Sequence, residues 1–87
     1  MKLLKENEKG KTYQVKDFKI FYRNKDSISG DNSENVEEEI YLISGSAEVT
    51  LKESTKIVEA PTKINFPAKT YHKIKALTDI IFILIEK

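Results

Sequence analysis

The chain has 87 residues, and its 15 basic and 14 acidic side chains leave a formal net charge of +1. This balance provides no net attraction to nucleic acid or to an anionic membrane, so we expect neither as a partner. Because the chain has no cysteine, disulfides and thiolate metal sites are excluded. The length is that of one small domain, here residues 1–87, whose stability as a monomer is expected to be marginal.

The N-terminal segment, residues 1–17, lacks the apolar stretch of roughly 7–15 residues that a signal peptide needs. The longest apolar run, Ile80–Ile85, is far too short to span a bilayer. We therefore expect a soluble, cytoplasmic protein. The alternating pattern of the N-terminal segment is typical of an edge strand.

Apolar and polar residues alternate with the period of two that is typical of β-strands, and no helical pattern is found. The first such stretch is Thr12–Tyr22. Asn24–Asn35 is polar and rich in turn residues, which predicts a loop over the mouth of a pocket. The apolar run Ile40–Ile43 is typical of a strand that is covered on both faces.

The second half of the chain contains further short segments that alternate or are apolar throughout. They are Ala47–Leu51, Lys56–Glu59, Ile64–Phe66, His72–Ala76 and Ile80–Ile85. Turn residues separate them, and the turn before the second segment is expected at Glu53–Thr55. About seven short strands at this spacing indicate a sandwich or barrel, so we predict an all-β fold.

Two stretches resemble the conserved motifs of the cupin superfamily. EEEIYLISGSAEVTL, residues 37 to 51, resembles the first motif, in which a metal-binding glutamate precedes a hairpin glycine; Glu38 and Gly45 hold those places. INFPAKTYH, residues 64 to 72, resembles the second motif, a proline turn followed by a histidine ligand; Pro67 and His72 hold those places. The resemblance covers Phe18–Lys87 and implies a jelly-roll β-barrel over residues 18–87, with a pocket between its sheets.

The sequence departs from the cupin pattern at the metal ligands. Cupins usually hold a divalent metal with three histidines and a glutamate, and the resemblance places the first two histidines within Asp31–Glu34. That segment has none, since His72 is the only histidine of the chain. We therefore expect no cofactor. The alternative is weak binding of Mn²⁺, Fe²⁺ or Zn²⁺ by Glu38 and His72, with Asp31, Asn32 or Glu34 as substitute oxygen ligands.

Two turns also depart from the cupin pattern. Pro61 and Thr62 replace a glycine–aspartate turn before the second motif, and proline cannot adopt the positive φ that glycine offers. Lys69 stands where the family has a turn glycine. We therefore expect altered geometry or mild backbone strain at Lys69.

The candidate pocket residues are Glu38, His72, Tyr41 and Tyr71. His72 shares its strand face with Ile74, and alternation also directs Glu38 to the inner face. An inward imidazole needs partners for its ring nitrogens, and Glu38 is the obvious one. The alternative is that His72 is a satisfied pocket-wall or core residue without chemistry.

The missing histidines favour a cupin-like domain that binds a small molecule or a protein partner without catalysis. The alternative is a metal-dependent isomerase, epimerase or dioxygenase with non-standard ligands, and a third possibility is a structural homodimer with a filled barrel. We expect a homodimer in any case, because cupins commonly pair through edge strands. Pairing also covers an edge that would otherwise promote aggregation.

Overall fold

The computed structural model describes residues 1–87 as ten β-strands, and no helix is long and apolar enough to cross a membrane. The strands are β1 (Lys2–Asn7), β2 (Gly10–Val15), β3 (Phe18–Arg23), β4 (Ile28–Asn32), β5 (Glu38–Ser44), β6 (Ser46–Leu51), β7 (Ser54–Glu59), β8 (Thr62–Phe66), β9 (His72–Ala76) and β10 (Ile80–Glu86).

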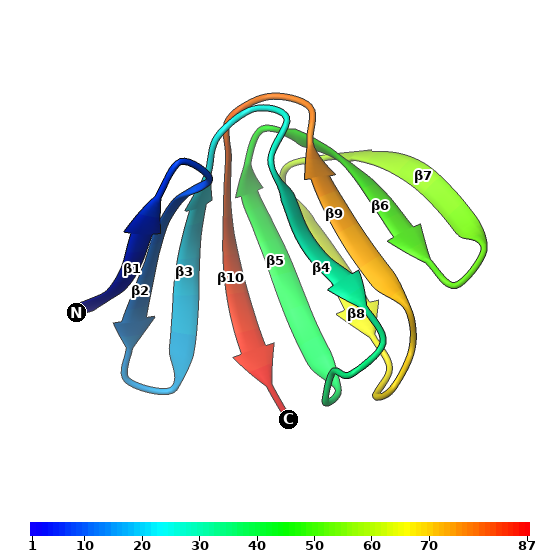
Figure 1. Ribbon diagram of the computed structural model, residues 1–87, viewed down its shortest axis with the longest axis horizontal. Helices are drawn as coiled ribbons and strands as arrows, with labels where there is room; N and C mark the ends of the chain where they lie inside the picture. The colour runs from blue at the N-terminus through cyan, green and yellow to red at the C-terminus, as the bar shows by residue number, and fades with distance from the viewer.

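The strands form two sheets that face each other (Figure 1). One has six strands in the order β1-β2-β3-β10-β5-β8, and the other has four in the order β4-β9-β6-β7. Every pair of neighbours is antiparallel. The predicted all-β jelly-roll type of fold is confirmed.

The hydrophobic core lies between the two sheets, where each strand turns alternate side chains inward. It consists of ten buried residues from β5, β6, β8, β9 and β10: Ile40, Leu42, Ala47, Val49, Ile64, Phe66, Ile74, Ala76, Ile80 and Phe82. No residue of β1 or β2 belongs to it, and β1 exposes all six of its residues. The large sheet therefore extends beyond the core on the side of β1–β3, which leaves room for a cavity there.

The N-terminal half has more strands than the sequence pattern predicts. Instead of one strand over Thr12–Tyr22, the chain forms the β2–β3 hairpin, in which Val15 pairs with Phe18. The two-residue turn between them places Lys16 at φ 51°. The turn between β6 and β7 is similar, with Lys52 at φ 56°, so β7 begins at Ser54, inside the turn predicted at Glu53–Thr55.

Two further predictions about strands were wrong. The expected loop Asn24–Asn35 contains β4, which pairs with β9 from Ile28 to Asn32 with a register shift between Gly30 and Asn32. The run Ile40–Ile43 is covered on one face only, because Tyr41 and Ile43 are 36% and 51% exposed. After Ile28, the residues of β4 have weak β propensity, and pairing with β9 overrides that propensity.

The turns that depart from the cupin pattern have unusual backbone geometry. The connection between β7 and β8 contains a cis peptide bond at Ala60–Pro61. Lys69, in the turn before β9, has φ 51°, in the left-handed region that costs an L-residue about 1–2 kcal/mol. A turn glycine would adopt the same backbone region, so of the two expectations for Lys69, altered geometry or mild backbone strain, the strain is confirmed.

Replacing Lys69 with glycine is expected to raise the free energy of unfolding by about 0.5–1 kcal/mol. Glycine removes the left-handed penalty, and the greater freedom of its unfolded chain offsets part of the gain. Urea denaturation at pH 7 measures the change. Lys69→Ala is the matched control, since it removes the exposed side chain but keeps the penalty. A glycine variant no more stable than the alanine variant would contradict this account.

Candidate functional site

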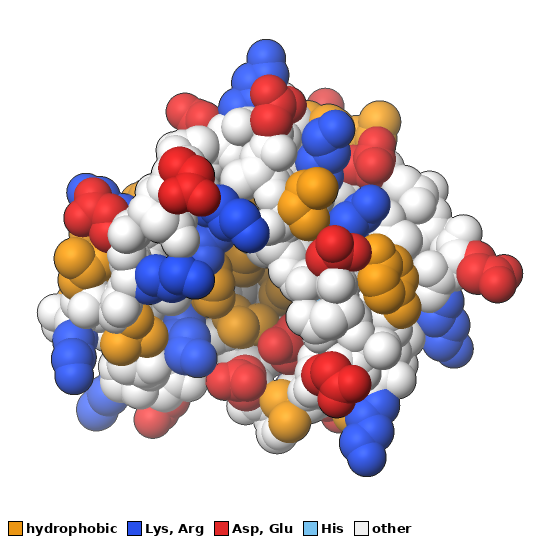
Figure 2. All heavy atoms as spheres, in the orientation of Figure 1, with side chains coloured by type: hydrophobic (Ala, Val, Ile, Leu, Met, Phe, Trp, Pro, Cys, Tyr) orange, Lys and Arg blue, Asp and Glu red, His pale blue; other side chains and the backbone are white.

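A cavity of about 350 Å³ lies between the sheets, bordered by β3, β4, β5, β9 and β10. Its apolar wall consists of Phe21, Ile40, Ile74, Phe82 and Leu84. Its polar side chains are those of Ser29, Asn32, Glu34, Asn35, Glu38 and His72. Figure 2 shows a hollow on this face with hydrophobic side chains at its floor, basic side chains along one side and acidic ones at its lower rim.

The structure brings Glu38 and His72 together in this cavity. Glu38 is the first residue of β5 and lies in phase with the buried Ile40. His72 is the first residue of β9 and lies in phase with the buried Ile74. The His72 Nε2 and Glu38 Oε1 atoms are 3.6 Å apart, and the two side chains are only 7% and 14% exposed.

The imidazole of His72 is fixed from three sides. Its Nδ1 lies 3.2 Å from the carbonyl oxygen of Thr70, and its ring packs against Phe66 with 4.6 Å between centroids. On the third side is Gly30, at φ 87°, where an added Cβ would lie 3.0 Å from His72 Cδ2. Gly30 therefore allows the backbone of β4 to approach the ring.

These contacts determine the protonation chemistry of the pair. A carbonyl only accepts hydrogen bonds, so the proton of the neutral ring lies on Nδ1, facing Thr70. The Nε2 atom, which faces Glu38, is then an acceptor. The pair is favourable when it holds one proton. A proton on Nε2 gives an ion pair with the Glu38 carboxylate, and a proton on the Glu38 carboxyl group gives a neutral acid beside a neutral base. The Glu38–His72 pair can therefore both donate a hydrogen bond to a ligand and accept one from it at the same point of the cavity.

Burial raises the pKa of the Glu38 carboxyl above its usual value. A charged His72 lowers this pKa, Glu86 raises it and Lys19 lowers it, but burial is the largest influence. A raised folded-state pKa means that Glu38 stabilises the fold most below its unfolded pKa. That contribution is lost as the pH rises through the folded pKa.

The stability of Glu38→Gln relative to the wild type is expected to increase as the pH rises from 4 to 7. The amide cannot ionise, so it avoids the cost of a buried carboxylate at the higher pH. Urea denaturation at both pH values measures the difference. Glu53→Gln, in the exposed β6–β7 turn, is the matched control and should show no such trend.

A second measurement is independent of stability. Side-chain carboxyl NMR should place the pKa of Glu38 above the usual range of a glutamate. In His72→Gln it should move higher still, because the charge that lowers the pKa is gone. A Glu38 pKa within or below the usual range of a glutamate would contradict the prediction.

The structure does not bring the two candidate tyrosines to this cavity. Tyr41 points out of β5, and its hydroxyl donates to the Glu39 carboxylate at 3.2 Å. The Tyr71 hydroxyl donates to Asp31, and this hydrogen bond raises the pKa of Tyr71. Neither tyrosine lines the space beside Glu38 and His72.

The other candidate metal ligands do not complete a coordination set. Asp31 is held by Tyr71, and the side chain of Asn32 bonds the carbonyl of Gly30 and the amide of Glu34. No three histidine, aspartate or glutamate side chains converge anywhere in the structure. Because transition metals in such sites need about four to six ligand positions, the residues present do not fit a tightly held metal.

Asn35 is a positioning residue that the sequence analysis missed. Its Nδ2 donates to the carbonyl of Pro67 at 2.7 Å, and its Oδ1 accepts from the amide of Thr70 at 3.2 Å. Its own carbonyl accepts from the amide of Lys69 at 2.8 Å. These bonds join the segment before β5 to the turn before His72. No local sequence pattern predicts a link between residues so far apart in the chain.

No protein-family model matches the sequence, and no curated protein matches it significantly. Among solved structures, a conserved protein of unknown function from Streptococcus pyogenes is similar with a TM-score of 0.73 and 25% identity, covering 87% of this chain and 70% of that one. A cupin superfamily protein from Desulfitobacterium hafniense has a TM-score of 0.75 and 13% identity, covering 86% and 72%.

The capsular polysaccharide assembling protein CapF from Staphylococcus aureus has a TM-score of 0.77 and 14% identity. That match covers 98% of this chain but 28% of CapF, so the chain spans less than a third of that protein. These likenesses agree with the two sequence motifs and with the arrangement of the sheets. The protein is therefore a small β-domain with the cupin fold.

Proposed function

We propose that this cupin domain binds a small polar molecule in the cavity beside Glu38 and His72, without catalysis. The observation that supports the proposal is the buried Glu38–His72 pair on the wall of a cavity of about 350 Å³. Cavities of several hundred Å³ with an apolar lining and a few polar groups are typical of small-molecule sites. A ligand hydroxyl or amide would both donate to and accept from the pair.

The second candidate is a metal-dependent enzyme of the isomerase, epimerase or dioxygenase type. The observation in its favour is Glu34, which lines the same cavity as Glu38 and His72. Its weakness is that these three side chains do not converge. Closing that gap would require the segment before β5 to move.

Metal analysis and ligand binding separate the two candidates. We expect no stoichiometric Mn, Fe or Zn in protein purified without chelator, and none after dialysis against these ions. Stoichiometric metal that disappears in His72→Ala would overturn the binding proposal in favour of the enzyme.

Ligand binding is tested with a set of small uncharged alcohols and amides, observed by amide NMR shifts around the cavity. His72→Phe, which keeps an aromatic ring but removes both nitrogens, should abolish the shifts. Tyr71→Phe, outside the cavity, should leave them unchanged. No shifts with any member of the set would count against the proposal.

We further propose that the domain forms a homodimer through the outer face of its six-stranded sheet. One row of this face runs through Tyr13, Ile20, Ile83 and Tyr41, which pair in register across β2, β3, β10 and β5. The same face carries Phe18, Tyr22, Ile43, Ile81 and Ile85. None of these residues belongs to the core, so this apolar sheet face has no partner within the chain.

A second copy of the chain fits the charges around this face. Glu6 pairs with Lys11 at one end, and Glu39 pairs with Lys87 and Lys63 at the other. Hydrogen bonds from Lys87 and Lys63 lower the pKa of Glu39 to about 2, so its charge persists at neutral pH. A rim with both signs can meet its own copy without repulsion.

The N-terminal edge strand expected from the sequence is less suited to pairing. It has a register shift between Leu3 and Lys5, and it carries lysines and a glutamate. Bulges and charged side chains on an edge strand oppose the addition of another strand. The outer face therefore replaces this edge as the proposed dimer surface.

Light scattering after gel filtration at about 100 μM should give twice the 10.0 kDa chain mass. Ile43→Asp, on the outer face, should give a monomer. Ile57→Asp on β7 is the matched control, because Ile57 is 68% exposed on the other sheet, and it should remain dimeric. A monomeric wild type, or a dimer that persists in Ile43→Asp, would overturn the proposal.

A further inference from the structure

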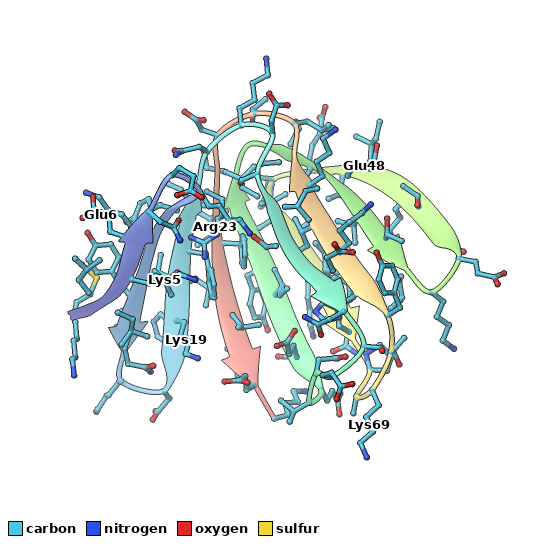
Figure 3. The ribbon with its side chains drawn as sticks, viewed as in Figure 1. Lys5, Glu6, Lys19, Arg23, Glu48 and Lys69 are labelled. Atoms are coloured by element: carbon cyan, nitrogen blue, oxygen red, sulfur yellow. The ribbon has the colours of Figure 1, made fainter.

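Arg23, the last residue of β3, is the only arginine of the chain and lies next to the cavity. Its guanidinium stands 4.7 Å from the centroid of the Phe21 ring, which lines the cavity wall. Figure 3 shows the side chains of Arg23, Lys5 and Lys19 beside β1–β3, the strands on one side of the hollow.

The guanidinium is held entirely by neutral acceptors. Its Nη2 donates to the hydroxyl of Thr12 at 2.9 Å, and its Nε donates to the hydroxyl of Ser29 at 3.3 Å. Its Nη1 donates to the carbonyls of Lys11 and Tyr22, both at 3.1 Å. These contacts fix the orientation of the group and occupy four of its five N–H donors, which leaves one on Nη2.

No carboxylate compensates the charge of Arg23. The ion pairs of the structure involve lysines and His72, and none involves Arg23. The group is half-buried, and its burial lowers the pKa of the guanidinium. Charged side chains that leave water usually have an ionic partner, because desolvation is costly. The missing counter-charge therefore has to be explained.

The surroundings of Arg23 add positive charge. A second hollow adjoins the cavity and shares Phe21, Ser29 and Gly30 with it. Lys5, Lys9 and Arg23 line this hollow, and Asp31 is its one acidic residue. Asp31 already accepts a hydrogen bond from Tyr71. Three basic groups against one acid favour an anion at this point.

We infer that Arg23 is the anion subsite of the cavity and that the ligand is a small organic anion with an apolar body. Its carboxylate or phosphate group would accept from the free N–H of Arg23, with Lys5 and Lys9 nearby. Its apolar part would lie over Phe21 and against Phe82, towards Glu38 and His72. This inference rests on the proposed binding of a small molecule in the cavity and adds the charge class of that molecule.

Arg23 also joins β2, β3 and β4 through its hydrogen bonds, and this structural role explains its position but not the absence of a counter-charge. No neutral side chain supplies four N–H donors, so the role of the charge has to be tested by substitution. Lysine at position 23 keeps the charge and loses the planar fork, whereas methionine keeps the bulk and loses the charge. The two substitutions therefore separate an electrostatic role from a packing role.

The test compares benzoate and phenyl phosphate with the neutral benzamide, by NMR titration at low ionic strength. Both anions should bind the wild type at least tenfold more tightly than benzamide, and added salt should reduce the difference. Arg23→Met should abolish the preference, and Arg23→Lys should retain part of it. If benzoate and phenyl phosphate differ, the tighter one identifies the anionic group.

Controls distinguish the two proposals. His72→Phe should abolish the shifts caused by the small uncharged alcohols and amides, but benzoate and phenyl phosphate should still bind more tightly than benzamide. If Arg23→Met fails to fold, the double variant Lys5→Gln/Lys9→Gln, which changes only exposed side chains, should reduce the preference. Equal binding of benzoate and benzamide by the wild type, or a preference that survives Arg23→Met, would overturn the inference. Loss of alcohol and amide binding alone would instead count against the proposed function.

Discussion

Replacing Phe66 with alanine is expected to lower the free energy of unfolding by about 3–5 kcal/mol. Phe66 is fully buried at the end of β8, and it is the largest side chain with no exposed surface. The core contains only ten residues, so little neighbouring structure can collapse into the space. A domain of this size is typically stable by about 4–13 kcal/mol, and the variant should be close to unfolded at 37 °C.

Urea denaturation measures this loss, and Phe66→Leu serves as its graded control. Leucine restores most of the volume and should recover more than half of the lost stability. Because the Phe66 ring packs against His72, the alanine variant should also shift the imidazole resonances of any folded fraction. A loss below about 1 kcal/mol would mean that the sheets do not enclose Phe66 as described.

The parts of the fold that the sequence predicted are those with a repeating signal. Alternation predicted strands over Ala47–Leu51 and His72–Ala76, and the structure has both strands with nearly the same bounds. The motif residues Glu38 and His72 lie on facing sheets, at the start of β5 and β9. In both cases the inward direction follows from the period of two, because every second side chain meets the opposite sheet.

The missed elements lacked a local signal. Hairpin turns are usually recognised by Asn-Gly or Asp-Gly pairs, whereas here a lysine takes the left-handed position at Lys16 and Lys52. β4 contains a glycine, an aspartate and an asparagine, which are all rare in strands. Its pairing with β9 is a tertiary contact, which the propensities of its own residues do not predict.

The candidate site was predictable only in part, for a similar reason. Glu38 and His72 belong to motifs, but Asn35 and Arg23 act through contacts between distant segments. Arg23 is the only arginine of a chain with fourteen lysines, but its missing counter-ion is visible only in three dimensions. Tyr41 is the opposite case, since its aromatic character suggested a pocket or an interface, while its strand phase directs it away from the cavity beside Glu38 and His72.

Gly45 joins β5 of one sheet to β6 of the other, at φ 91°. An added Cβ would lie 2.3 Å from the carbonyl oxygen of Asp79 and 2.6 Å from Thr78 Oγ1. These neighbours belong to the connection between β9 and β10, which is itself fixed by the hydrogen bond from the Ser46 amide to Thr78 Oγ1. The contact with Asp79 involves backbone, so it cannot be relieved by rotating a side chain.

Gly45→Ala is therefore expected to cost about 2–5 kcal/mol, from the positive φ and from the forced separation of the two connections. Urea denaturation again provides the measurement. Ser44→Ala, at the adjacent exposed position, should change stability by less than about 0.5 kcal/mol. Gly30→Ala should fall between them, because its added Cβ meets the His72 ring at 3.0 Å rather than a carbonyl at 2.3 Å. If Gly45→Ala were as stable as Ser44→Ala, the close approach of the two connections would be wrong, and with it the structural reason for glycine in the first cupin motif.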